Sequence, residues 1–126
     1  MHLTKTIYFG SIMKELILIK TLEYYDVPQI LVAADATGTN YLCTLYKNDA
    51  EDGYLYLGVQ ISGTRLAAFT DGQLDLRDAY VYPEADCCLC LVAATNGVLN
   101  IVKPLQIRDI TEEMLPEAGY TYSMVQ

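Results

Sequence analysis

The chain has 126 residues, of which 52% are hydrophobic and 19% charged, and its formal net charge is −8. This length fits one domain, and the apolar content is too high for a disordered chain. Binding to nucleic acids or to anionic membranes depends on clustered lysine and arginine, which an acidic chain with scattered basic residues does not offer. We therefore expect no nucleic-acid partner and no membrane partner.

The first predicted strand covers residues 15–25, where apolar side chains occupy both faces at the start. A strand that is apolar on both sides usually lies in the centre of a sheet. We expect a single domain over residues 15–126, with residues 1–14 forming an N-terminal arm outside the core. Met1 and Met13 both remain open as the native start.

Two further strands are predicted over residues 29–35 and 40–47, joined by a turn around Gly38. The clearest alternation of the chain follows in residues 54–61, which predicts a half-buried antiparallel strand. Its aliphatic side chains point one way and its tyrosines the other. The aliphatic row is Leu55, Leu57, Val59 and Ile61, and the tyrosines are Tyr54 and Tyr56.

The period then changes from that of a strand to that of a helix. Ser62 is a good N-cap for a helix that runs to about Thr70. Asp75 is an N-cap for a second short helix from Leu76 to about Tyr80.

Two more strands are predicted over residues 87–94 and 98–107, joined by the Asn96-Gly97 hairpin signal. The predicted fold class is therefore α+β. It is a mainly antiparallel sheet of about six strands, with two short helices between strands four and five that cover one face.

The residues for several common chemistries are missing or badly spaced. The only histidine is His2, which removes the usual general base for serine or cysteine nucleophiles. Cys87, Cys88 and Cys90 lack the spacing of a zinc knuckle and lie among apolar residues, so we expect buried thiols. The glycines do not form a phosphate-binding loop. We predict no cofactor, no metal and no enzyme activity, and a cytoplasmic location, because four clustered cysteines without a signal peptide do not suit a secreted scaffold.

Tyrosine is unusually frequent, with 11 copies beside no tryptophan and two phenylalanines. Exposed tyrosines often anchor protein interfaces, because they bury a large area at little entropic cost. Packing of the same tyrosines in a second, minor core is the alternative, and the sequence leaves both open. The candidate partner-binding residues are Tyr24, Tyr25, Asp26, Tyr54, Tyr56, Arg65 and Arg77.

Two segments resemble a known family. They are Leu22-Glu23-Tyr24-Tyr25-Asp26-x-Pro28 and Gly72-x-x-Asp75-Leu76-Arg77-Asp78-Ala79. In this order they resemble small bacterial proteins that form a domain family of unknown function. The resemblance implies a bacterial source and a self-contained domain, and it brings no activity, substrate or cofactor.

These observations favour a non-enzymatic, acidic module that binds another protein, of an immunity-like, antitoxin-like or regulatory kind. Its charge favours a partner with a basic surface. A homo-oligomeric structural protein, for example a homodimer paired through an edge strand, is one alternative. A small-molecule-binding domain or unusual enzyme that uses Glu23, Tyr24, Asp26 and Arg77 is another.

Overall fold

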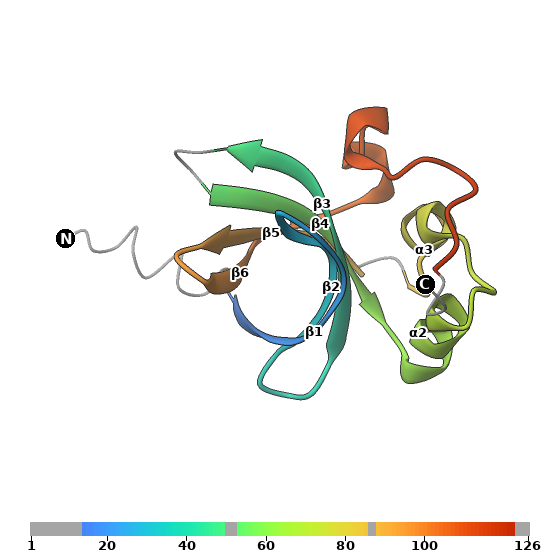
Figure 1. The fold of residues 1–126 in the computed structure, drawn as a ribbon, viewed down its shortest axis with the longest axis horizontal. Helices are drawn as coiled ribbons and strands as arrows, with labels where there is room; N and C mark the ends of the chain where they lie inside the picture. The colour runs from blue at the N-terminus through green and yellow to red at the C-terminus, as the bar shows by residue number, and fades with distance from the viewer. Residues whose placement is uncertain (1–13, 50–52, 86–87, 123–126) are drawn as a thin grey trace.

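Six antiparallel strands close into a barrel in the order of the sequence, β1-β2-β3-β4-β5-β6. The structure is a computed structural model that describes residues 14–49, 53–85 and 88–122 (Figure 1). The strands are β1 (Lys14–Tyr25), β2 (Val27–Ala34), β3 (Asn40–Asp49), β4 (Gly53–Ile61), β5 (Leu89–Thr95) and β6 (Val98–Leu105). Of the predicted arm, residues 1–14, only Lys14 lies within the described residues.

The predicted antiparallel pairing is confirmed, but the predicted fold class, an open α+β sheet, is wrong. The structure is a closed barrel in which β1 pairs with β6, through Lys14 with Ile101 and Leu16 with Leu99. Closure has a physical reason, because an open sheet leaves two rows of unpaired backbone groups at its edges. Period-two spacing predicts which side chains share a face, but it carries no information about whether the edges meet.

Both faces of the clearest strand, β4, are buried. Leu57 and Val59 on the aliphatic face are 0% and 2% exposed, and they pack under the helices. Tyr56 on the reverse face is 1% exposed, and it points into the barrel. The two rows therefore lie on opposite sides as predicted, but the tyrosine side at Tyr56 is an interior. A barrel of so few strands is filled by its own side chains.

The core consequently has two layers. The inner layer fills the barrel, and its buried members are Leu16, Leu31, Ala33, Tyr41, Cys43, Tyr56, Cys90, Val92, Leu99 and Ile101. The outer layer lies between the barrel wall and the helices, and it includes Ile30, Val32, Leu42, Leu57, Val59, Ile61, Phe69, Leu76, Tyr80 and Leu89.

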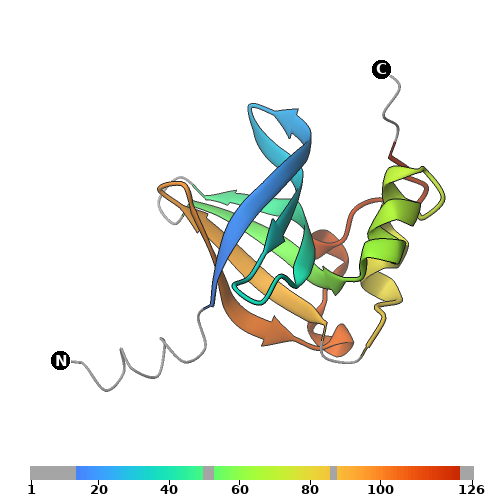
Figure 2. The ribbon, with the colours of Figure 1, turned by 90° about the horizontal axis from the view of Figure 1, so that it is seen from below.

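Two helices lie between β4 and β5, as predicted: α2 (Gly63–Thr70) and α3 (Leu76–Val81). Their caps are the predicted ones. The Ser62 side chain accepts a hydrogen bond from the Arg65 amide at 3.2 Å, and Asp75 accepts one from the Arg77 amide at 2.9 Å. The helices cover one side of the barrel (Figure 2), where the Tyr80 hydroxyl donates to the Leu42 carbonyl at 3.1 Å.

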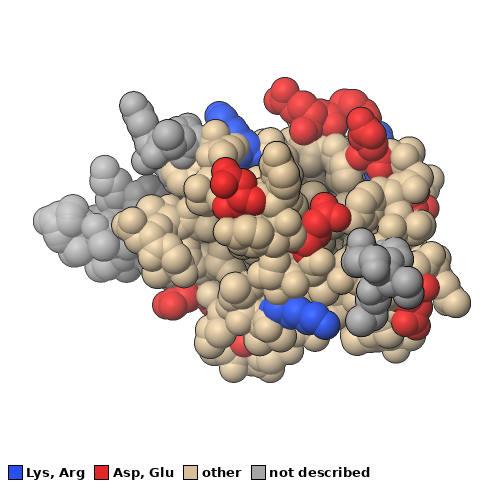
Figure 3. All heavy atoms as spheres, in the orientation of Figure 1, with Lys and Arg blue, Asp and Glu red and all other residues tan. Residues whose placement is uncertain are grey.

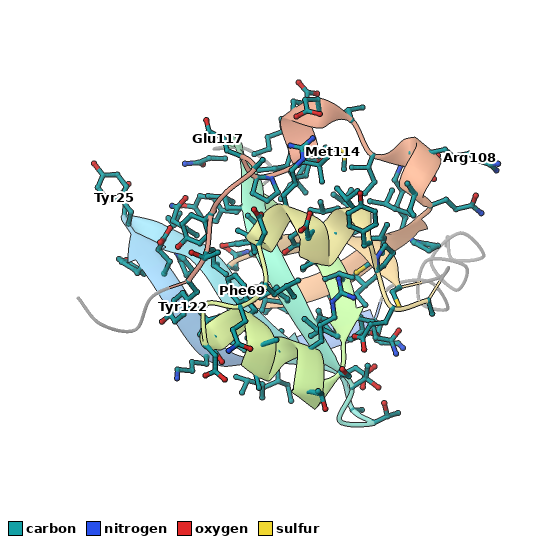
Figure 4. The ribbon with its side chains drawn as sticks, turned by 90° about the vertical axis from the view of Figure 1, so that its right-hand side faces the viewer. Tyr25, Phe69, Arg108, Met114, Glu117 and Tyr122 are labelled. Carbon is teal, nitrogen blue, oxygen red and sulfur yellow. The ribbon has the colours of Figure 1, made fainter. Side chains whose placement is uncertain are left out.

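The C-terminal segment crosses back over the helices. It contains two short 3-10 helices, η1 (Ile107–Asp109) and η2 (Glu112–Met114). The Leu76 amide donates to the Tyr120 carbonyl at 2.9 Å, so the segment holds the start of α3. The ring centroids of Tyr122 and Phe69 lie 5.6 Å apart. Both side chains are labelled in Figure 4, which views the molecule from the helix side.

The turn between β2 and β3 is organised by one buried carboxylate, Asp35. It accepts hydrogen bonds from the Thr37 hydroxyl at 2.6 Å, the Thr37 amide at 2.9 Å and the Thr39 amide at 3.1 Å. Lys14 forms an ion pair with it at 3.4 Å. The Thr37 hydroxyl contributes most to lowering the pKa of Asp35 to about 2, and this outweighs the opposing effect of burial.

Candidate binding face at the open end of the barrel

The barrel is incompletely closed at the end where the β1–β2 and β5–β6 hairpins turn. Among the described residues, β1 and β6 form three residue pairs, and the pair nearest the hairpin turns joins Leu16 to Leu99. β1 then continues to Tyr25, paired with β2 alone among the strands that the structure describes. In Figure 2 this hairpin stands clear of the barrel wall. The result is a strand edge, residues 17–25, that pairs with no second strand among the described residues.

Three consecutive apolar side chains lie exposed where β1 separates from β6. Ile17, Leu18 and Ile19 are 63%, 48% and 58% exposed. Adjacent residues of a strand point to opposite faces, so both faces of β1 meet solvent here. Irregularities in the β1–β2 register follow directly, the first between Leu18 and Lys20. Bulges of this kind twist a strand away from its sheet. We call residues 17–19 the β1 patch.

This exposure corrects the prediction that residues 15–25 form a central strand. The sequence signal for an edge strand was the charged residues around the apolar run, which are Lys14, Glu15, Lys20 and Glu23. Charged residues of this kind are typical of edge strands, where they discourage uncontrolled pairing.

The tip of the hairpin presents two tyrosines. Tyr24 and Tyr25 are 66% and 79% exposed, and Tyr25 projects from the end of the hairpin in Figure 4. The turn is stiffened by hydrogen bonds from the Tyr24 hydroxyl to the Asp26 carbonyl at 3.0 Å and from the Gln29 side chain to the Tyr25 carbonyl at 2.9 Å. Asp26 has a φ of 68°, a left-handed conformation that aspartate tolerates better than most residues. The tip is therefore an ordered, aromatic projection.

A cavity of about 200 Å³ opens beside the β1 patch, between β1 and the β5–β6 turn. Its lining is mostly apolar or aromatic: Leu18, Pro28, Leu31, Tyr54, Tyr56, Ala94, Asn96, Gly97 and Leu99. We call it the mouth cavity. The Tyr56 hydroxyl donates to the Pro28 carbonyl at 2.7 Å, and burial raises the pKa of Tyr56 to about 12. The Tyr56 side chain in the cavity wall is therefore uncharged at neutral pH.

The structure brings five of the seven predicted partner-binding residues to this end of the barrel, in two groups. Tyr24, Tyr25 and Asp26 form the hairpin tip, and Tyr54 and Tyr56 line the mouth cavity. Only the group at the hairpin tip is exposed on the surface, because Tyr56 is buried and Tyr54 is partly buried against the inner core.

The two predicted arginines lie on the helices instead. Arg65 donates to the carbonyls of Asp78 and Tyr82, at 3.1 and 2.5 Å, and so ties α2 to α3. Arg77 donates to the Pro116 carbonyl at 3.1 Å and to the Glu112 carboxylate at 2.7 Å, and so holds the C-terminal segment. Their contacts orient elements of the fold.

Comparison with known proteins adds a family to this geometry. The model of a family of unknown function, DUF6575, matches residues 4–124. The chain belongs to this family. Comparison with curated proteins and with solved structures finds no match for the chain. Membership agrees with the resemblance to a family of unknown function, while the bacterial source and the two motifs remain predictions.

A second hollow, of about 640 Å³, lies between the barrel and the C-terminal segment. Glu23, Thr44, Glu117 and Tyr120 are among its lining residues, and the Tyr120 hydroxyl donates to the Glu23 carboxylate. Burial first, and then this carboxylate, raise the pKa of Tyr120. Of the alternative small-molecule set, Glu23, Tyr24, Asp26 and Arg77, only Glu23 lines this hollow, so the hollow does not bring that set together.

The cysteines within the described residues are buried and unbridged: Cys43, Cys88 and Cys90. Burial raises the pKa of the Cys90 thiol to about 12, and that of Cys43 is raised for the same reason. Cys87 lies outside the described residues. Across residues 14–49, 53–85 and 88–122, no three histidine, cysteine or acidic side chains lie together as metal ligands would. No helix in that same part of the chain has both the length and the apolar character needed to cross a membrane.

Proposed function

We propose that this domain is a non-enzymatic interaction module of the bacterial cytoplasm that binds another protein through the exposed edge of β1. The observation that carries the proposal is the departure of β1 from β6 after Leu16, which leaves the β1 patch exposed beside an edge that pairs with no second described strand. Free thiols at three buried cysteines support a reducing compartment.

Strand addition is the binding mode that suits this edge. An extended segment of a partner can pair with the amide and carbonyl groups of residues 17–25 that bond no described strand, and the main-chain hydrogen bonds then supply affinity. Apolar side chains of the β1 patch contribute roughly 25 cal/mol for each Å² that is removed from water. Tyr24 and Tyr25 at the tip add aromatic anchors of the kind found at interface hot spots.

Charge favours a basic partner over a second copy of the chain. Two copies would each bring a net charge of −8, and this repulsion opposes self-association. On the face drawn in Figure 3 acidic groups are widespread and basic groups are few. A basic partner would be steered toward such a surface, and its association would slow as salt is raised. A regulatory, immunity or antitoxin role is compatible with a small acidic binder of this type.

The test is affinity capture from the native host at low salt, with variants that change only the exposed patch. Ile17→Ser combined with Ile19→Ser removes apolar surface, and the fold is expected to tolerate it, because substitutions at exposed positions usually change stability by about 0.5 kcal/mol or less. Ile107→Ser is the matched control, because Ile107 is 52% exposed and lies on η1.

We expect one protein to be retained by the wild type and by Ile107→Ser, and lost from the double variant. Hydrogen exchange of the complex should show new protection in residues 17–25. A wild type that retains no protein, or a double variant that retains it equally, would refute the proposal. Light scattering that shows a dimer dependent on Ile17 and Ile19 would assign the edge to self-association instead.

A further inference from the structure

We propose that the mouth cavity receives one uncharged aromatic side chain, carried by the partner segment that pairs with β1. This inference rests on the proposed function, and it names what the partner must present. The mouth cavity, between β1 and the β5–β6 turn, would then act as the pocket that selects the partner.

The position of the cavity is the first argument. Leu18 of β1 forms one side, and Asn96, Gly97 and Leu99 of the β5–β6 turn and β6 form the other. The cavity therefore lies where β6 would have continued alongside β1 had the seam been longer. A segment added to the free edge would occupy that position, and every second side chain of a strand points to the same face. Side chains on its inner face would point into the mouth cavity.

The size of the cavity selects the kind of group. A volume of about 200 Å³ is below the roughly 300–1,000 Å³ of pockets that hold drug-sized ligands. It exceeds the roughly 150 Å³ of an apolar protein cavity that binds benzene. One six-membered ring with a small substituent fits these limits, while a nucleotide or a larger cofactor does not.

The chemistry of the wall excludes a charged group. All nine described residues that line the cavity are uncharged, and the apolar share of the wall comes from residues such as Leu31 and Leu99. An ion placed there would lose its hydration without gaining a counter-charge. The rings of Tyr54 and Tyr56 offer aromatic edges and faces, and ring pairs contribute about 0.5–1.5 kcal/mol beyond the burial of their area. The Tyr56 hydroxyl donor is already used by Pro28, so apolar contact dominates.

The first experiment uses toluene as the probe and the full chain labelled with ¹⁵N. We expect saturable shifts confined to residues that line the mouth cavity, while benzylammonium, which carries a charge, produces none at the same concentration. Ala94→Leu fills the cavity and should weaken toluene binding at least tenfold. Ala93→Leu is the matched control, because Ala93 is the neighbouring residue of β5 and does not line the cavity. It should change binding less than twofold.

The second experiment repeats the capture assay with the same variants. Loss of the partner with Ala94→Leu, and retention with Ala93→Leu, is the expected result. If Ala94→Leu fails to fold, Leu18→Trp narrows the entrance from a half-exposed position, and Ile17→Trp is its control, because Ile17 belongs to the same patch but does not line the cavity. Capture that survives both cavity variants, or toluene shifts that do not map to the lining, would overturn the inference. Capture that depends on Ile17 and Ile19 but not on Ala94 or Leu18 would leave the proposed function standing.

Discussion

The interior position of the reverse face of β4 can be tested at Gly58. A Cβ atom added there would lie 3.0 Å from the Cys90 sulfur, 3.1 Å from a methyl of Val92 and 3.5 Å from the Cys43 sulfur. Gly58 has no positive φ that would itself penalise a side chain. Gly58→Val therefore tests packing inside the barrel and little else.

The two possible positions of this face predict opposite signs. If the face were exposed, Gly58→Val would stabilise the protein, because loss of glycine flexibility contributes about 0.4–1 kcal/mol and valine favours strands. Inside the barrel, overpacking costs typically 1–3 kcal/mol, and we expect a net loss of about 2 kcal/mol. With a urea dependence of about 1–3 kcal/mol per molar, the midpoint of unfolding would fall by roughly 1 M.

The assay is urea unfolding followed by far-ultraviolet circular dichroism and by tyrosine fluorescence, since the chain has no tryptophan. Cys90→Ala removes the nearest obstructing atom, so the double variant should lose less stability than the sum of the single variants, by about 1 kcal/mol. Gly63→Val is the control, because a Cβ at Gly63 meets no atom within 4 Å. A Gly58→Val protein as stable as the wild type, or more stable, would refute the closed, filled barrel.

Three further predictions concern the turn, the thiols and the C-terminal segment. The pKa of Asp35 is lowered to about 2, so its stabilisation is present above the ordinary value of 3.8 and is lost as pH falls toward 2; Asp35→Asn should remove about 1–2 kcal/mol of this dependence in unfolding curves between pH 5 and pH 2. Cys43 and Cys90 are buried and their pKa values are raised, so both should resist iodoacetamide at pH 8 and react on unfolding in urea, and fast labelling of the folded protein, read by mass spectrometry, would contradict this. Arg77→Gln should free the segment around Glu112, seen as faster amide exchange of residues 112–120 with little change in β4, whereas equal exchange in both proteins would show that the contacts of Arg77 do not hold it.

Local features of the fold could be predicted from the sequence, because their causes are local. Ser62 and Asp75 cap the helices as expected, since a cap is one side chain that bonds an amide two or three residues on. The alternation in residues 54–61 likewise fixed which side chains share a face. Barrel closure could not be predicted, because it depends on pairing between Leu16 and Leu99, which no local pattern reports.

Some features of the candidate binding face could likewise be predicted from the sequence, and others could not. Exposure of Tyr24 and Tyr25 follows from their place beside a turn, so the sequence could indicate the tip. Burial of Tyr56 depends on the curvature of the whole sheet, and its hydroxyl finds Pro28, 28 residues away. The exposure of Ile17 and Ile19 depends on β1 leaving β6, and an apolar run alone predicts the opposite environment.

The pairing of β1 with β6, the seam that closes the barrel, also affects how quickly the chain folds. Every other strand pair joins strands that are consecutive along the chain, whereas the seam joins residues 83 to 87 positions apart, from Leu16 with Leu99 to Lys14 with Ile101. Bringing two distant segments together costs chain entropy before any hydrogen bond between them forms. Contacts between residues far apart in the sequence therefore slow folding. We expect β1 and β6 to pair last, after the folding transition state. Replacing Leu16 or Leu99 by alanine should then accelerate unfolding and hardly change the refolding rate.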